Sequence, residues 1–228
     1  MVAEFLKTVR IFRQLSDEAL REMSECFKVR KYRKNNLIIF EEDAGLLFFV
    51  IRSGKVKISR ISQQGEEVIL AILGQGQFFG EVSIIDGGTR SATVTSLDDV
   101  ELLTVGRDRF QYFMKQYPEL SMSLLREMAA RFRKSDAQIK SLSLMDARER
   151  VANTLFQLAM ELGVERREHE YVIEDLPRQL DLANIAGTSR ETVSRIIGSL
   201  QDDGLIERDG NRLIIPDVFR LERVFNEV

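Results

Sequence analysis

Short apolar runs separated by turn residues fill the first half of the chain, and longer helical patterns fill the second half. A capped helix is predicted over residues 16–27, with Ser16 as its N-cap. Six segments rich in Val, Ile, Leu, Phe and Thr follow, separated by turns such as Ser53-Gly54. This pattern predicts an all-β unit, a barrel or sandwich, over about residues 28–106.

Residues 118–145 predict one long helix, because no glycine or further proline interrupts them after Pro118. Positions three and four residues apart form an apolar seam with a single polar member, Leu125, Met128, Phe132, Ser135, Ile139 and Leu142. Such a helix can pack on its own β-unit. The highly charged flanks favour instead a parallel pair of helices that makes a homodimer.

The C-terminal part begins at Asp146, which can form a capping box with Glu149 in a helix that ends at Gly163. The stretch after it is predicted to be a loop and a short strand, with His169 as a solvated surface residue. The expected domains are residues 1–117, a dimerisation helix over 118–145, and residues 146–228.

Residues 177–200 carry the strongest pattern in the chain. A short helix over 177–186 reaches Gly187, and Ser189 caps a second helix whose buried face is expected to be Val193, Ile196, Ile197 and Leu200. An Asp-Gly turn between two short apolar strands then predicts a β-hairpin. Together these elements predict a winged helix-turn-helix, and the fold class is α+β.

The second helix of this unit is the expected DNA-reading element. Four side chains lie off its apolar stripe, Arg190, Glu191, Ser194 and Arg195. Arginine can donate two parallel bonds to guanine, and glutamate can accept from cytosine N4. Arg178, Thr188 and Ser189 are candidates for phosphate contacts. The alternative is a helical hairpin with a solvated face, and the excess of acidic residues here weakens a purely electrostatic case for DNA.

Glu81 and Arg90 enclose a second candidate site, between the turns that Gly80 and Gly87-Gly88 allow. If a helical turn lies between them, amides around Ser83 to Ile85 would form an anion cradle. Arg90 would neutralise a phosphate, Ser91 would add a hydroxyl and an amide donor, and Glu81 would accept from a sugar hydroxyl. The alternative is an ion pair between Glu81 and Arg90 within a β-hairpin.

Composition excludes several kinds of chemistry. The 228 residues include one cysteine and one histidine, too few for an internal disulfide, a cysteine-ligated iron–sulfur cluster or a zinc site of cysteines and histidines. No apolar run approaches the roughly 18 residues that cross a bilayer, so we expect a soluble, cytoplasmic protein without membrane contacts. Neither a bound metal nor a prosthetic group is expected.

Both candidate sites, in this order around a long helix, resemble the CRP/FNR family of bacterial transcription regulators over nearly the whole chain. The phosphate-binding motif of that family matches at Gly80, Glu81, Ser83, Arg90, Ser91 and Ala92. Its recognition helix matches at Ser189, Arg190, Glu191, Thr192, Val193 and Arg195. The resemblance implies that Gly80 and Glu81 meet a ribose and that Arg90 and Ser91 meet a cyclic phosphate.

The resemblance also assigns residues of the long helix. Ser135 would reach the adenine amino group, and Arg131, one turn earlier, would brace Glu81. The next position is a serine of the other subunit in the cyclic-AMP-binding branch and is Asp136 here, which suits adenine N6 or guanine N1 and N2. The implied effector is a cyclic nucleotide, cyclic AMP first.

The implied protein is a homodimeric regulator that binds double-stranded DNA and works with RNA polymerase. A regulator of the same fold that needs no ligand, or takes another anionic metabolite, is the alternative. An enzyme such as a phosphodiesterase is disfavoured, because one histidine far from Glu81 offers neither metal ligands nor an acid–base pair. The oxygen-sensing and haem-binding branches of the family would need more cysteines or a histidine in the sensory domain.

Overall fold

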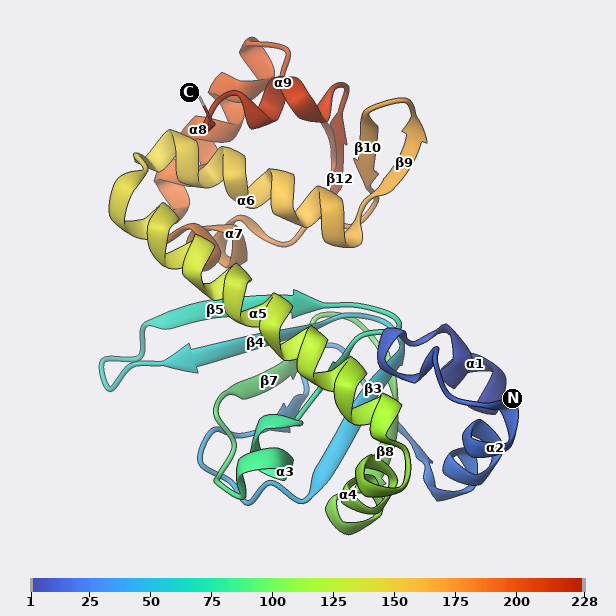
Figure 1. Cartoon of the computed structure of the whole chain (residues 1–228). Helices are drawn as coiled ribbons and strands as arrows, with labels where there is room; N and C mark the ends of the chain where they lie inside the picture. The colour runs from blue at the N-terminus through green and yellow to red at the C-terminus, as the bar shows by residue number, and fades with distance from the viewer. Residues whose placement is uncertain (1, 227–228) are drawn as a thin grey trace. The chain divides into compact units, whose positions relative to one another are not determined.

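The computed structural model describes residues 2–226 (Figure 1). Contacts group the chain into two compact units, one up to Arg133 and one from Lys134 onward, and each is described by itself. The first unit contains α1 (Val2–Thr8), η1 (Arg10–Phe12), α2 (Asp17–Cys26), α3 (Val82–Asp86), α4 (Arg107–Gln116) and the first part of α5 (Pro118–Leu144). As predicted, the Ser16 hydroxyl caps α2 by accepting from the amide of Ala19.

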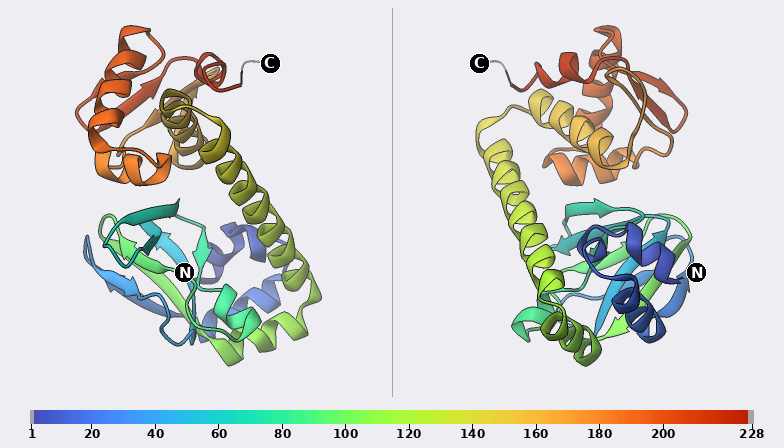
Figure 2. Two further views of the ribbon diagram at one scale, coloured as in Figure 1. Left: turned by 90° about the vertical axis from the view of Figure 1, so that its left-hand side faces the viewer. Right: turned by 45° about the vertical axis from the view of Figure 1, so that its right-hand side comes forward.

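Two four-stranded antiparallel sheets form the β part of the first unit (Figure 2). The first has the order β1-β8-β3-β6, built from β1 (Lys28–Tyr32), β8 (Val100–Gly106), β3 (Leu47–Ser53) and β6 (Phe78–Phe79). The second has the order β2-β7-β4-β5, built from β2 (Leu37–Ile39), β7 (Thr93–Ser96), β4 (Val56–Ile61) and β5 (Glu67–Leu73). The all-β prediction over residues 28–106 is thus confirmed, with the addition of α3.

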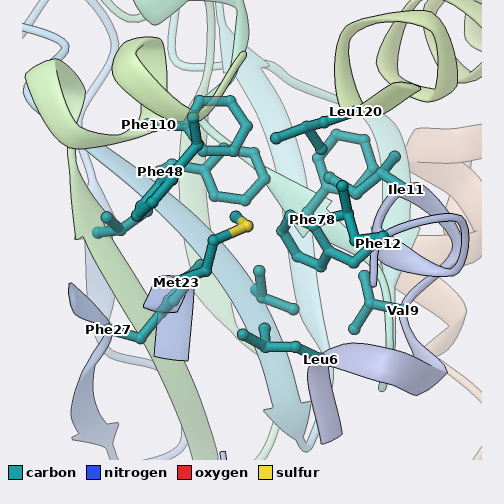
Figure 3. Close-up of a cluster of buried hydrophobic side chains, with 14 of the residues drawn as sticks. Leu6, Val9, Ile11, Phe12, Met23, Phe27, Phe48, Phe78, Phe110 and Leu120 are labelled. Carbon is teal, nitrogen blue, oxygen red and sulfur yellow. The ribbon is translucent and has the colours of Figure 1, made fainter. Parts of the chain in front are cut away.

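Strand β3 is buried on both faces, so its alternating side chains serve two cores. Phe49 and Ile51 belong to the core that includes residues of both sheets. Phe48 belongs to the core shared with the helices, where its ring stacks on Phe110 with centroids 4.0 Å apart (Figure 3). Burying a phenylalanine contributes about 1.5–3 kcal/mol. This double burial holds β3 and its neighbour β6 rigidly beside the candidate ligand site.

The second unit contains the end of α5, the helices α6 (Ala147–Leu162), α7 (Gln179–Ala186), α8 (Arg190–Asp202) and α9 (Val218–Glu222), and one sheet. That sheet has the order β11-β12-β10-β9, built from β9 (Val164–Arg167), β10 (Glu170–Ile173), β11 (Glu207–Asp209) and β12 (Arg212–Ile215). Asp146 and Glu149 form the predicted capping box of α6. The predicted hairpin is the pair β11 and β12.

The structure corrects several local expectations. The stretch after α6 is a hairpin of two strands, in which His169 adopts φ +68° at the turn, instead of a loop with one strand. Strand β7 begins at Thr93 rather than at Arg90, and α7 begins at Gln179 rather than Pro177. Over residues 2–226, no helix is both long and apolar enough to span a membrane.

Candidate functional site

The backbone at Gly80 places the candidate ligand site directly against Arg90. Strand β6 pairs with β3 and leads into Gly80, which has φ +81°. A Cβ atom at this position would lie 2.7 Å from Nη1 of Arg90 and 3.0 Å from the carbonyl oxygen of Leu47. Only glycine combines this conformation with so close an approach.

The segment between Glu81 and Arg90 contains the predicted helical turn, α3, which uses two of the amides expected in the anion cradle. The amides of Ile84 and Ile85 both donate to the carbonyl of Glu81, each at 3.0 Å. These two donors are therefore used within the turn. Ile84 and Ile85 therefore do not offer free amides to the predicted anion cradle, whereas the part of the cradle at Ser83 stays a prediction.

Arg90 is 6% exposed and is held by three acceptors of the protein. Its Nη1 donates to the carbonyl of Gly80 and to Oγ of Ser83, both at 3.0 Å, and its Nη2 donates to the carbonyl of Leu47 at 2.8 Å. Burial lowers the pKa of Arg90, and nearby Glu81 opposes that shift. A guanidinium has five N–H donors, so these bonds fix its plane and still leave donors for an anion.

Glu81 is 3% exposed and pairs with Arg131 of α5, whose Nη1 lies 2.9 Å from Oε1 of Glu81. Nη2 of Arg131 donates to the carbonyl of Phe78 at 2.7 Å, and the guanidinium lies over the Phe78 ring. This is the predicted brace, and the described ion pairs include no Glu81–Arg90 pair. Burial raises the pKa of Glu81, an effect that Arg131 partly offsets. Among the described residues, Oε2 of Glu81 has no hydrogen-bond partner although it is buried.

The other predicted ligand residues fall into three surroundings. Ser83 is buried beside Arg90, whereas Ser91 is exposed just before β7. Ser135 and Asp136 lie on α5 in the second unit, four and five residues after Arg131. The first unit alone therefore brings together Gly80, Glu81, Ser83, Arg90 and Arg131.

The exposed face of α8 carries the second candidate site. Ser189 caps the helix by accepting from the amide of Thr192, and the predicted face, Val193, Ile196, Ile197 and Leu200, is buried. The four predicted base-reading residues are all exposed, namely Arg190, Glu191, Ser194 and Arg195. Together with Gln179 they line one hollow of 460 Å³. Hydrogen bonds from its own amide and from Ser189 lower the pKa of Glu191 and keep it an acceptor.

Gln179 was missed from the sequence, although it is the first residue of α7 and shares this hollow. The first helix was expected to begin at Pro177, so Gln179 was placed inside the helix instead of at its start. Arg178 is exposed as the N-cap of α7. Thr188 is half-buried, and its amide donates to the carbonyl of Ala183.

Two arginines at the start of α6 fasten the helix-turn-helix to its surroundings. Arg150 donates to the carbonyls of Ala186 and Gly187 in the turn, and also to that of Met145 at the end of α5. Arg148 donates to Oγ of Ser199 and pairs with Asp203 at the end of α8. Arg150 thus links the backbone at Met145 to the turn between α7 and α8.

The apolar seam of α5 is largely exposed. Met128 packs against the core of the first unit, whereas four seam residues are between 45% and 68% exposed, Leu125, Phe132, Ile139 and Leu142. A row of large exposed apolar side chains is typical of an interaction surface.

Comparison with known proteins finds a family model over each part of the chain that carries a candidate site. The cyclic nucleotide-binding domain model matches residues 29–117, and the Crp-like helix-turn-helix domain model matches residues 149–224. A CRP-like cAMP-activated global transcriptional regulator of Mycobacterium tuberculosis is 31% identical over 96% of this chain and 98% of its own length. The cyclic AMP receptor protein of Thermus thermophilus is 32% identical, with the same coverage. The structure of FixK2 from Bradyrhizobium japonicum has the same fold, with a TM-score of 0.81 at 20% identity over 89% of this chain and 98% of that one.

A cyclic nucleotide-binding domain followed by a helix-turn-helix defines a transcription regulator and not an enzyme. The chain belongs to the CRP/FNR family.

Proposed function

We propose that this regulator is a homodimer whose binding to specific DNA is controlled by cyclic AMP held at Glu81 and Arg90. The observation that carries the ligand assignment is that one unit contains both a buried carboxylate oxygen without a hydrogen-bond partner, Oε2 of Glu81, and a guanidinium of fixed orientation, that of Arg90. Oε2 of Glu81 fits a ribose hydroxyl, which would satisfy it. Arg90, already oriented by Gly80, Ser83 and Leu47, fits the cyclic phosphate, with Ser91 beside it.

The base of the nucleotide would meet α5. In this proposal Ser135 binds the adenine amino group and Asp136 of the second subunit accepts from the same base edge. The exposed seam of α5 supports the dimer that this arrangement needs, since each helix would cover the other's apolar side chains. Ligand binding would then order the seam and move Met145, and through Arg150 the helix-turn-helix.

DNA recognition is assigned to α8. Arg190, Glu191, Ser194 and Arg195 would read base edges in the major groove, and Arg178, Thr188 and Ser189 would contact phosphates. Two recognition helices must lie about 34 Å apart to reach successive major grooves. The bound dimer would act with RNA polymerase.

A titration calorimetry experiment tests the effector. The wild-type protein is expected to bind one of cyclic AMP and cyclic GMP with micromolar affinity. Arg90→Ala should weaken that binding at least about a hundredfold, because a buried charge-assisted contact is lost. The exposed Arg60, which pairs with Glu41 in the same unit, is the matched control, and Arg60→Ala should leave the affinity unchanged.

Absence of binding by the wild-type protein would favour the alternative, a regulator of the same fold with another effector or none.

A further inference from the structure

Ser83 lies between the guanidinium of Arg90 and a neighbouring loop. Its Oγ accepts from Nη1 of Arg90 at 3.0 Å, and its side chain is 1% exposed. On the other side is Gly45, where a Cβ atom would lie 2.1 Å from Oγ and 2.2 Å from Cβ of Ser83. The serine side chain therefore fills the space between Arg90 and the Gly45 backbone.

The loop that carries Gly45 also holds the backbone of Arg90. The amide of Arg90 donates to the carbonyl of Asp43 at 2.9 Å, and the carbonyl of Arg90 accepts from the amide of Glu42 at 3.0 Å. The loop thus fixes Arg90 twice, directly at its backbone and through Ser83 at its side chain. Glycine at position 45 allows this close approach to Ser83, because a side chain there would displace the serine.

We propose that Ser83 is a positioning residue for Arg90, seated by Gly45, and that it acts on the nucleotide only through the guanidinium. This inference rests on the proposed function. Nη1 has two N–H donors, and the structure gives one to the Gly80 carbonyl and the other to Ser83. Both acceptors together fix the plane of the guanidinium and hence the direction of the donors left for a phosphate. Without the hydroxyl, one buried donor of Arg90 loses its acceptor and the side chain can rotate.

A double-mutant cycle on cyclic AMP affinity tests this role. Ser83→Ala should weaken binding about tenfold in the wild-type background, the effect of one hydrogen bond to a charged group. In an Arg90→Lys background the same change should alter affinity less than about twofold, since the planar guanidinium that Ser83 orients is gone. Ser91→Ala is the control, because a residue that touches the phosphate itself should weaken binding in both backgrounds.

Gly45→Ala gives an independent variant that keeps the hydroxyl but displaces it. It should weaken binding with Arg90 present and have little effect with Arg90→Lys, while thermal unfolding identifies any variant that fails to fold. If Ser83→Ala had equal effects in both backgrounds, or left the affinity unchanged in the wild-type background, the positioning role of Ser83 would be overturned. The proposed effector would not be affected by that result. Failure of the wild-type protein to bind cyclic AMP would overturn the proposed effector and this assignment together.

Discussion

At the scale of residues, the proposed ligand site contains two charged side chains, Glu81 and Arg90, that the fold buries. Glu81 and Arg90 are both nearly inaccessible, yet each is stabilised by different partners, Arg131 for the carboxylate and backbone carbonyls for the guanidinium. Burying such groups is costly unless they are paired. Both groups are thus held by hydrogen bonds, and one carboxylate oxygen of Glu81 has no partner among the described residues, which is why we propose a ligand donor for it.

Burial raises the pKa of Glu81, and from this we expect the affinity for the proposed ligand to depend on pH. The ionised carboxylate is the form that accepts two hydrogen bonds, so affinity should fall as the pH falls through this raised pKa. The loss should begin at a higher pH than the ordinary pKa of glutamate, about 4.3, would give. Calorimetric titrations between about pH 8 and about pH 5 measure it, and Glu81→Gln should bind more weakly but without this pH dependence. If the affinities of the wild-type protein and of Glu81→Gln changed equally with pH, the pH dependence would belong to another group.

At the scale of elements, most of the sequence predictions are confirmed where a pattern repeats or a cap is present. The helix capped at Asp146, the buried face of α8 and the β11–β12 hairpin follow from local chemistry. Strand β1 was missed because all five of its residues are exposed or half-buried, which removes the apolar alternation. Helix α4 was missed because its two buried residues, Phe110 and Phe113, are too few to show a helical period.

The residues of the candidate site could be proposed from the sequence, but fewer of their contacts could. The Gly80-Glu81 and Arg90-Ser91 pairs were found from residue types, and the link from Arg131 to Glu81 came from the family resemblance. That Ser83 faces Arg90, and that Gln179 joins the hollow on α8, depend on tertiary approach between distant segments. No spacing in the sequence encodes such contacts.

The seam of α5 predicts which substitution should weaken the proposed dimer. Phe132→Ser removes one of the largest exposed apolar side chains of the seam and should raise the dimer dissociation constant at least about tenfold. Leu144→Ser is the matched control, because Leu144 is 75% exposed but lies off the seam spacing. Sedimentation equilibrium compares the two. A dimer that Leu144→Ser weakens and Phe132→Ser does not would place the interface elsewhere.

The face of α8 predicts a difference between base-reading and phosphate-contacting residues. Arg190→Ala should relax base preference at one position of each half-site, at a cost of about 1–3 kcal/mol for the preferred base. Arg178→Ala should weaken binding evenly across sequences and reduce its salt dependence. Selection of binding sites from random DNA compares the two variants. If both variants select the same site motif as the wild-type protein, the assignment of base reading to α8 is contradicted.

At the scale of the whole molecule, the helix α5 connects the two units that carry the candidate sites. It supplies Arg131 to the first unit and ends at Leu144, and the carbonyl of the next residue, Met145, accepts from the same guanidinium that holds the turn between α7 and α8. For cyclic AMP to act as a switch it must bind the DNA-competent state more tightly, and about 5.5 kcal/mol of difference would shift the equilibrium almost completely. Equal binding to both states would switch nothing.

The most direct test measures DNA binding by fluorescence anisotropy with and without cyclic AMP, on a palindromic site obtained by selection. The account predicts that cyclic AMP strengthens binding of the wild-type protein at least about tenfold, within the usual range of coupling between sites. It also predicts that cyclic AMP does nothing for Arg90→Ala, while Arg60→Ala responds like the wild type. DNA affinity that is the same with and without cyclic AMP in the wild-type protein would contradict the account.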